Sequence, residues 1–417
     1  MSSQVMGTGT SVVVDRCQVC QAEGLKPILF VGYLPPVNAM RDIGAQPREE
    51  AAYPAQLLLC ETCQLIQLGL IVDAQILFPH SYPYTSSTTK ILRENFAELY
   101  QECVGLLELK PEHLVVDIGS NDGNLLINFK DKHRICGVTP EKVGEIAIAR
   151  GIPTLISYFD AAIVDRIVQE QGKAHMVTAT NVFAHMENVR GVLEGVTRLL
   201  DPNGVFLTES HYVLELIKTV QYDTIYHEHL RYYSLHSLQY LLAMHGLEVF
   251  HAKLIPTHGG SIRVYSAPKG SRPIQASVEQ LLQAEKIGLS WEALTAFKAA
   301  VLKSRQQLWS IVADIKSKQE RIVGISAPSR ASTLIHYCGL DEGVLESVVE
   351  IKGSHKIGKY IPGTLIPVVE ESALFADPQP DYALLLSWHI ADELIPKLRS
   401  LGFRNRFIVP LPEPRVV

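Results

Sequence analysis

The chain has 417 residues, of which 47% are hydrophobic and 20% are charged, a composition typical of a globular protein with two or three domains. Its net charge of −6 and pI near 6.2 exclude an overall electrostatic attraction to nucleic acid or to an anionic membrane, although a local basic pocket is compatible with them. No apolar run is as long as a bilayer span or a signal-peptide core. We therefore expect a cytoplasmic protein with a small-molecule partner, and the sequence leaves open whether it is a monomer or a homodimer.

Four of the seven cysteines form two Cys-x-x-Cys pairs, Cys17 with Cys20 and Cys60 with Cys63. Each pair can place two thiolates on one ion, and together they supply the four ligands of a tetrahedral zinc site. A redox dithiol or disulfides are the alternatives, but a matched pair in a cytoplasmic chain favours zinc. Because four protein ligands leave no open position, the zinc should be structural.

The zinc would stabilise a small module over residues 16–78, which follows a flexible tail over residues 1–15 and is too poor in core to fold alone. A proline-broken loop then contains Tyr82 and Tyr84. Tyrosines in such a loop more often pack than act, but this loop also joins two domains, a common place for a ligand pocket. A helix follows, with Ser87 or a neighbouring Thr as its N-cap, and extends to about residue 109.

A glycine-rich turn, residues 119–123, follows a buried strand and precedes the start of a helix. Such a turn lets the backbone approach a ligand at a helix N-terminus, as in nucleotide-binding α/β folds. Asn121 occupies the middle glycine position of a G-x-G-x-G pattern, which is tolerable because Asn accepts left-handed backbone better than most residues. The turn therefore predicts a nucleotide-type cofactor site.

The next elements alternate as a parallel sheet requires. They are strands near residues 135–138, 174–179 and 205–209, and helices near 141–150, 189–200 and 213–220. Ser234 is expected to cap a further helix, and a hairpin should join residues 247–255 to 261–266. By fold-level analogy, a helix and a closing hairpin distinguish class I S-adenosylmethionine (SAM) methyltransferases from NAD-binding Rossmann domains.

The stretch from Tyr226 through His227 and Glu228 to His229 has two imidazoles flanking a carboxylate, with phenols on both sides. No other stretch of similar length has so many groups that move protons near neutral pH. Ordinary solvated histidines in a surface loop are the simpler alternative, and a metal site would need further ligands that this stretch does not supply. We interpret it as a proton-transfer centre.

Helical periodicity over residues 275–319, broken near Gly288, leads to strands near 321–326, 345–350, 381–388 and 406–409, which predict a second α/β unit. Ser329 and Arg330 follow its first strand, where a polar turn suits a phosphate or is a plain connection. Lys352 and Lys356 follow a later strand and either hold pyrophosphate or form a solvated basic loop. The predicted fold class is α/β: a small zinc-binding module, a central Rossmann-like domain over residues 79–267 and a second Rossmann-like domain over residues 268–417.

Five motifs together resemble those of the zinc-module sugar-nucleotide C-methyltransferases, over nearly the whole chain from Cys17 onward. They are the paired Cys-x-x-Cys, Asp-x-Gly-Ser-Asn-Asp-Gly, Tyr-His-Glu-His, Thr-His-Gly-Gly-Ser-x-Arg and Lys-x-Gly-Lys-Tyr-Ile-Pro-Gly. The resemblance implies a zinc-binding domain, a central SAM-binding domain and a C-terminal domain that helps to hold a nucleotide sugar. It also implies methylation of the carbon next to the keto group of a nucleotide-linked deoxysugar.

The resemblance implies that His229 is the general base, with Glu228, Tyr226 and His227 beside it and Tyr82 or Tyr84 as a pocket tyrosine. We expect the SAM contacts to come from Asp117, Gly119, Ser120, Asn121, Asp122, Gly123, Leu125, Thr139, Pro140, Glu141 and Asn181. We expect the acceptor contacts to come from His258, Gly260, Ser261, Arg263, Ser329, Arg330, Lys352 and Lys356.

The chain departs from the family pattern at three places. Thr139-Pro140 stands where an acid commonly holds the SAM ribose, so Glu141 or a backbone group should make that contact. Glu209-Ser210-His211-Tyr212 replaces the common Glu-x-Pro-His, and Pro-Ser-Arg-Ala replaces Pro-Ala-Lys-Gly before residue 332. The second and third changes bear on the acceptor.

The leading hypothesis is a SAM-dependent C-methyltransferase that acts on a nucleotide-linked keto-deoxysugar. One alternative transfers the methyl group to oxygen or nitrogen of another small metabolite, a reaction that also needs a base. A second alternative is a non-catalytic zinc- and nucleotide-binding protein, against which the glycine turn and the base cluster argue.

Overall fold

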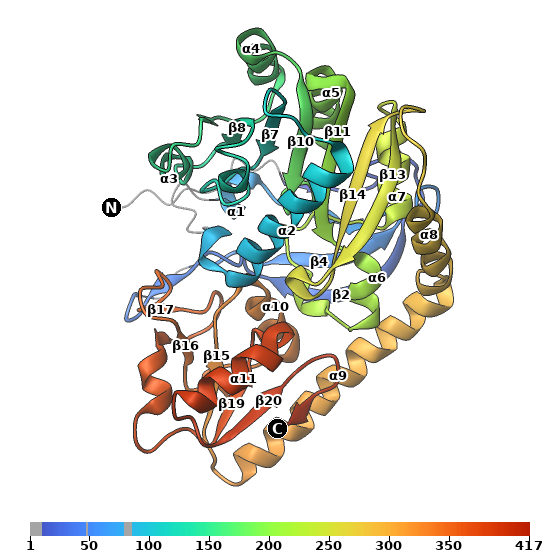
Figure 1. Cartoon of the computed structure of the whole chain (residues 1–417). Coiled ribbons are helices and arrows are strands. Elements are labelled where there is room, and N and C mark those ends of the chain that lie inside the picture. Colours follow the sequence, from blue (N-terminus) through green and yellow to red (C-terminus); the bar gives the residue numbers. More distant parts are fainter. Residues whose placement is uncertain (1–10, 47–48, 79–85) are drawn as a thin grey trace.

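The computed structural model describes residues 11–46, 49–78 and 86–417, which form three α/β parts (Figure 1). Tyr82 and Tyr84 lie outside the described residues. Within these residues, no helix is both long and apolar enough to cross a bilayer. The expected fold class is confirmed, because a four-cysteine cluster, a central Rossmann-like sheet and a C-terminal parallel sheet follow one another along the chain.

The central sheet has seven strands in the order β13-β14-β11-β10-β7-β8-β9. Its strands are β7 (Leu114–Ile118), β8 (Arg134–Thr139), β9 (Thr154–Ile156), β10 (Ala174–Thr180), β11 (Leu200–His211), β13 (Leu247–Ile255) and β14 (Ser261–Pro268). Strand β14 is antiparallel to both β11 and β13, whereas the other pairs are parallel. The predicted closing hairpin is therefore confirmed.

Helices cover this sheet, and their apolar residues recur at the three- and four-residue spacing of a buried helical face. The helices are α2 (Lys90–Leu107), α3 (Gly144–Ala149), α4 (Ala161–Gln171), α5 (Val189–Leu199), α6 (Val213–Lys218) and α7 (Leu235–Ala243). Thr89 is the N-cap of α2, and Ser234 caps α7 in a reciprocal capping box with Ser237. Helix α3 is shorter than expected at its start.

The α-helix expected directly after the glycine turn is wrong. The chain forms only a short 3-10 helix there, η2 (Leu126–Asn128). The Asn128 side-chain amide donates to the carbonyls of Asn124 and Leu125 at 3.2 and 3.1 Å, and these are carbonyls that a continuing helix would use. Local side-chain bonding of this kind competes with helix propagation.

The N-terminal sheet has the order β12-β5-β4-β2. Strands β2 (Lys26–Leu34), β4 (Tyr53–Leu59) and β5 (Ile66–Leu68) belong to the predicted module, but β12 (Arg231–Tyr232) comes from the segment just after His229. Figure 1 shows this blue sheet between the central domain and the C-terminal unit. The module thus obtains its fourth strand from the proton-transfer segment.

Smaller elements extend the module. Strand β1 (Val12–Val13) pairs with β6 (Leu70–Ile71), so two residues of the expected tail form a strand. Strand β3 (Arg41–Asp42) pairs with β17 (Lys359–Tyr360) of the C-terminal unit, and α1 (Ala74–Leu77) ends the module. The domain boundaries inferred from sequence stay predictions.

Two helices, α8 (Ala276–Gly288) and α9 (Trp291–Ser317), lead from the central domain to the C-terminal unit, with the predicted break between them. Figure 1 shows α9 along one side of both parts. The C-terminal sheet has the order β18-β16-β15-β19-β20-β21. Its elements are β15 (Ile322–Ile325), α10 (Ser329–Cys338), β16 (Val348–Glu350), β18 (Val368–Glu370), β19 (Tyr382–Leu385), α11 (Ala391–Ser400), β20 (Arg406–Val409) and the antiparallel β21 (Arg415–Val416). The strands β17, β18 and β21 were not predicted.

Candidate functional site

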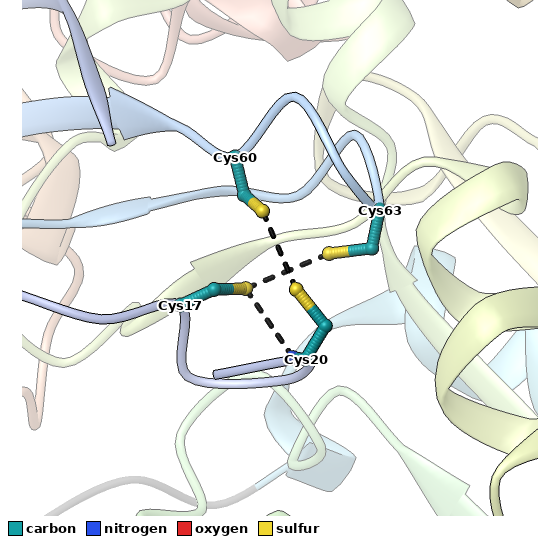
Figure 2. A group of neighbouring side chains, drawn as sticks. All are labelled: Cys17, Cys20, Cys60 and Cys63. Carbon is teal, nitrogen blue, oxygen red and sulfur yellow. Dashed lines mark hydrogen bonds between the residues drawn. The ribbon is translucent and has the colours of Figure 1, made fainter. Parts of the chain in front are cut away.

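Cys17, Cys20, Cys60 and Cys63 bring their sulfurs within 4.8 Å of one another, and Figure 2 shows all four side chains pointing toward a common centre. The sulfurs of Cys17 and Cys63, and those of Cys20 and Cys60, are 3.5 Å apart. Four thiolates at this spacing fit one tetrahedral zinc ion, with Zn–S bonds of about 2.3 Å.

The backbone around the first knuckle also fits a bound metal. The amides of Val19 and Cys20 point at the Cys17 sulfur from 3.4 and 3.5 Å, and such N–H groups stabilise a thiolate. Three of the four cysteines are buried. The site therefore suits a structural zinc ion with no open position for chemistry.

The glycine turn after β7 is held by two short backbone bonds, from Gly119 and Ser120 amides to the Val138 carbonyl at 2.8 and 3.1 Å. Gly119 has a φ of +75°, and a Cβ there would lie 2.4 Å from Val182 Cγ1. Glycine is therefore required for both conformation and space. Asn121 adopts a φ of +51°, the left-handed conformation expected from its place in the pattern.

Beside the turn, Asp117 is buried and accepts a hydrogen bond from Thr178 Oγ1 at 2.6 Å. Burial raises the pKa of the Asp117 carboxyl to about 7. Asp122 accepts from Ser86 Oγ at 2.8 Å and pairs with Arg150. The turn is thus braced by η1 (Ser86–Thr88), the segment that precedes α2.

At the end of β8, Thr139 Oγ1 donates to Glu141 Oε2 over 2.7 Å. This bond holds the Glu141 carboxylate at the carboxyl end of the strand, the place expected for a ribose contact. Asn181, which follows β10, has a φ of +57° and donates its amide to the Glu209 carbonyl at 2.8 Å. Leu125 is instead buried in the core.

His229 lies in the proton-transfer segment with its Nδ1 2.9 Å from the Thr224 carbonyl. A carbonyl only accepts hydrogen bonds, so Nδ1 carries the hydrogen. Burial, with His185 next, lowers the pKa of His229 well below its usual value, so the ring is neutral and its Nε2 carries a lone pair. The rings of Tyr226 and His185 lie 4.2 and 4.9 Å away, centroid to centroid.

The N-terminal module holds the two residues before His229. His227 donates from Nε2 to the Pro54 carbonyl at 3.2 Å, and Asn38 Nδ2 donates to Glu228 Oε1 at 2.6 Å. His227 is only 2% exposed, whereas His229 is partly exposed. The strand pair β5–β12 then fixes the chain immediately after His229.

The C-terminal unit holds the start of the same segment, η3 (Tyr222–Thr224). Asp223 is fully buried and accepts from Arg330 Nε and Nη2 at 2.8 and 2.9 Å, and from Trp388 Nε1 at 2.7 Å. Thr333 Oγ1 donates to the Ile225 carbonyl at 3.1 Å. The charge of Arg330 is thus paired with Asp223.

The Thr257–Gly260 turn packs against η3. The Gly259 carbonyl accepts from Gln221 Nε2 at 2.6 Å, and a Cβ at Gly259 would lie 2.7 Å from Gln221 Oε1. His258 has a φ of +56°, and its carbonyl is 3.5 Å from Arg330 Nη1. The two glycines of this motif, Gly259 and Gly260, therefore allow the turn to approach the segment closely.

Of the other expected acceptor residues, Lys356 meets the turn before Ser329, whereas Arg263 and Ser261 bond partners elsewhere. Arg263 is fully buried and pairs with Glu209, Glu98 and Glu102, while Ser261 is buried and donates to the Thr257 carbonyl. Lys356 Nζ donates to the Ala327 carbonyl at 2.5 Å, and burial lowers its pKa. Ser329 begins α10, and Lys352 is exposed.

Comparison with known proteins matches three family models in chain order. They describe a zinc binding domain over residues 17–78, a methyltransferase domain over residues 89–252 and a C-methyltransferase C-terminal domain over residues 256–412. The chain is also 32% identical, over 97% of its own length and 97% of the relative's, to the C-methyltransferase NovU of Streptomyces niveus. The chain belongs to the SAM-dependent C-methyltransferase family. This membership excludes the alternative hypothesis that the chain is a non-catalytic zinc- and nucleotide-binding protein.

Two solved methyltransferase structures align with part of this C-methyltransferase. A SAM-dependent methyltransferase from Clostridium acetobutylicum aligns with 44% of the chain and 94% of its own, at 12% identity and a TM-score of 0.34. The magnesium protoporphyrin IX methyltransferase of Synechocystis, solved with bound SAM, aligns with 42% of the chain and 81% of its own, at 15% identity and a TM-score of 0.32.

Around the proton-transfer segment lies a histidine cluster, defined as His185, His211, His229, His258 and His389. The rings of His185 and His229 lie 4.9 Å apart, centroid to centroid. After burial, the positively charged forms of His211 and His258 also contribute to lowering the pKa of both His229 and His389. Burial, followed by the charge of Arg330, lowers the pKa of His211 to about 3, of His258 to about 4 and of His389 to about 2. Sequence reasoning named His211, His229 and His258 but missed His185 and His389, which lie outside the motifs.

Proposed function

We propose that the enzyme methylates the carbon adjacent to the ketone of a nucleotide-linked keto-deoxysugar, with His229 as the general base. The observation that carries this proposal is the bond from His229 Nδ1 to the Thr224 carbonyl at 2.9 Å. It fixes the tautomer whose Nε2 is a free base, in a ring kept neutral by burial.

A neutral histidine base suits the C-methylation that the family carries out. A ketone acidifies the neighbouring C–H, and His229 Nε2 removes that proton while the electron pair moves to the ketone oxygen to form an enolate. The pKa of Tyr226 is raised well above its usual value by burial, so its phenol stays protonated and able to donate to the enolate. SAM, when bound, supplies the electrophilic methyl group and leaves as S-adenosylhomocysteine.

His229 is preferred over His227 because of exposure. The His227 ring is 2% exposed and is turned toward Pro54 of the N-terminal module, whereas a base must reach the acceptor. Glu228 is held by Asn38 and is assigned a positioning role. Tyr82 or Tyr84 remains proposed as a pocket tyrosine on sequence grounds alone.

SAM is proposed to bind along the glycine turn, with Asp117 and Asn121 near it and Glu141 at the ribose. The 2.4 Å separation expected between a Cβ at Gly119 and Val182 supports a tightly fitted turn. Gly119→Val is expected to abolish SAM binding, as measured by isothermal titration. The nucleotide is assigned to the C-terminal unit, where Ser329, Lys352 and Lys356 lie at strand ends, as ligands do in α/β folds.

The test is proton exchange. A thymidine diphosphate-linked 4-keto-6-deoxyhexose is incubated with the enzyme in heavy water, with S-adenosylhomocysteine in place of SAM, and deuterium uptake next to the ketone is followed by NMR. His229→Ala should slow both exchange and methylation by about 10²–10⁴-fold, with SAM affinity nearly unchanged, whereas His227→Ala should cost less.

His133→Phe, a change at a ring that contacts the Lys110 carbonyl outside the histidine cluster, serves as the matched control. If His229→Ala still exchanged the proton next to the ketone at the wild-type rate, His229 would not be the base. If the product carried its new methyl group on oxygen, the reaction would not need an enolate.

A further inference from the structure

Gln221 is a buried amide whose orientation is fixed by its partners. Its Nε2 lies 2.6 Å from the Gly259 carbonyl and 2.7 Å from Thr219 Oγ1. Because a carbonyl only accepts hydrogen bonds, this end of the amide must be the nitrogen. The other end, Oε1, accepts from Arg330 Nη2 at 3.0 Å, and a guanidinium only donates, so both ends agree.

The fixed amide determines the tautomer of His211. His211 Nε2 lies 3.2 Å from Gln221 Oε1, and an amide oxygen only accepts, so Nε2 carries the hydrogen. Burial and the nearby Arg330 lower the pKa of His211 to about 3, which keeps the ring neutral near pH 7. The other ring nitrogen, Nδ1, therefore has a lone pair and no hydrogen.

His211 Nδ1 is buried and has no hydrogen-bond partner among the residues that the structure describes. A buried acceptor left unsatisfied is costly, and each such atom in a native protein calls for an explanation. The group that completes it must bring an O–H or N–H. The phosphates of a nucleotide sugar are ionised diesters without such a hydrogen, so they do not fit this position.

The surroundings also suit an uncharged group. The nearest cation, Arg330, is already paired with Asp223 through two bonds of 2.8 and 2.9 Å. His258 Nε2 and His389 Nδ1 are likewise buried without a partner in the described chain. The corner formed by these three histidines thus offers several neutral hydrogen-bonding atoms and no unpaired charge of its own.

This corner adjoins the base. His211 is the last residue of β11, and its residue pair across to β14 is Ser261. His211 bonds the Gln221 side chain, the Gln221 backbone carbonyl accepts from the Thr224 amide at 3.1 Å, and the Thr224 carbonyl accepts from His229. An acceptor that presents its acidic carbon to His229 therefore has neighbouring ring substituents within the same cluster.

We propose that His211 is a specificity-determining residue that accepts a hydrogen bond, through Nδ1, from a ring hydroxyl of the acceptor sugar. The inference rests on the proposed function, which it deepens by assigning the sugar ring, rather than the phosphates, to the corner between His211 and Arg330. It also connects two positions at which the chain departs from the family pattern, because His211 and Arg330 both bond the same Gln221 oxygen.

The wild-type enzyme tests this inference directly. Its probes are a thymidine diphosphate-linked 4-keto-6-deoxyhexose and the counterparts that lack the 2-hydroxyl or the 3-hydroxyl, each titrated calorimetrically with S-adenosylhomocysteine present. Removing the hydroxyl that meets His211 should weaken binding by about tenfold to a hundredfold, and removing the other should have a smaller effect. Equal affinities for all three would overturn the proposal.

His211→Phe keeps a ring but removes the acceptor atom, so the preference between hydroxylated and deoxygenated probes should disappear. His133→Phe is the control and should keep it. A preference that survives in folded His211→Phe would assign the hydroxyl to another residue and overturn the proposal.

Failure of the proposed function is distinguishable. If none of the three probes binds, the nucleotide-sugar assignment is contradicted, and the ¹⁵N chemical shifts of His211 in the free protein then decide the inference. An unprotonated Nδ1 beside a protonated Nε2 supports the acceptor role, while the opposite tautomer or a doubly protonated ring overturns it.

Discussion

The N-terminal module and the C-terminal unit hold the same short segment, residues 222–232, by different physical means. The module uses hydrogen bonds: His227 donates to the Pro54 carbonyl, Asn38 donates to Glu228, and β5 pairs with β12. The C-terminal unit uses a buried ion pair between Arg330 and Asp223. The contacts of the N-terminal module depend on a metal-stabilised fold, whereas the contact of the C-terminal unit depends on an ion pair. The position of His229 should therefore be sensitive to both, although each can be disrupted separately.

Zinc removal should have the largest effect. We expect about one zinc per chain as purified, and chelation should loosen residues 16–78 because structural zinc contributes directly to folding. Since β12 completes the module's sheet, hydrogen exchange of residues 222–232 should rise as well, and methylation should be lost. Metal analysis that finds no zinc would contradict the zinc site. If hydrogen exchange of β12 did not change on chelation, the zinc module would not be what holds the segment around His229.

Asp223→Ala, which breaks the ion pair with the C-terminal unit, should have the next largest effect. It leaves the Arg330 charge buried without its partner, which should lower the free energy of unfolding by about 3–5 kcal/mol. The matched control is Glu346→Ala, which breaks the exposed Arg321–Glu346 pair and should cost less than about 1 kcal/mol. Denaturant unfolding measures both, and equal losses would show that Asp223 is not the anchor.

Asn38→Ala should act on turnover more than on stability. Loss of the 2.6 Å bond to Glu228 should lower kcat by roughly tenfold, in line with hydrogen bonds to carboxylates, while SAM affinity and Tm change little. Gln64→Ala removes an exposed bond within the same module and should leave kcat unchanged. If Asn38→Ala kept the wild-type kcat, the bond from Asn38 would not be needed to position Glu228 for turnover.

The last expected effect is a pH dependence of stability, which appears only in acid. The folded-state pKa values of His185 and His258, about 4 because of burial, lie below the unfolded value of about 6.5. The unfolded state therefore binds more protons between these values, so stability is fully present above pH 6.5 and falls as the pH drops toward 4. Unfolding measured at several pH values should show this slope, and His258→Phe should flatten it.

The sequence was sufficient where chemistry lies within one stretch. The Cys-x-x-Cys pairs predicted the metal cluster, the glycine turn predicted left-handed Asn121, and the alternation of apolar segments predicted the sheet with its closing hairpin. These features depend on spacing and local conformation, which a sequence displays directly.

Features that depend on distant partners were missed. Asp223 and Arg330 are far apart in the chain, and His185 and His389 come from different elements that only the fold brings together. The helix expected after the glycine turn failed for a local reason, since the Asn128 side chain bonds the carbonyls that a helix needs.

The pairing of Arg231 with Gln67 also sets an order during synthesis. The cysteines leave the ribosome early, so the metal can bind before the central domain exists, but β5 then lacks its neighbour until residue 231 has been made. During that interval one edge of the first sheet has unpaired backbone amides and carbonyls, which are a template for pairing with other chains. This edge of the nascent chain therefore stays open to such pairing until β12, the strand that follows His229, has been made.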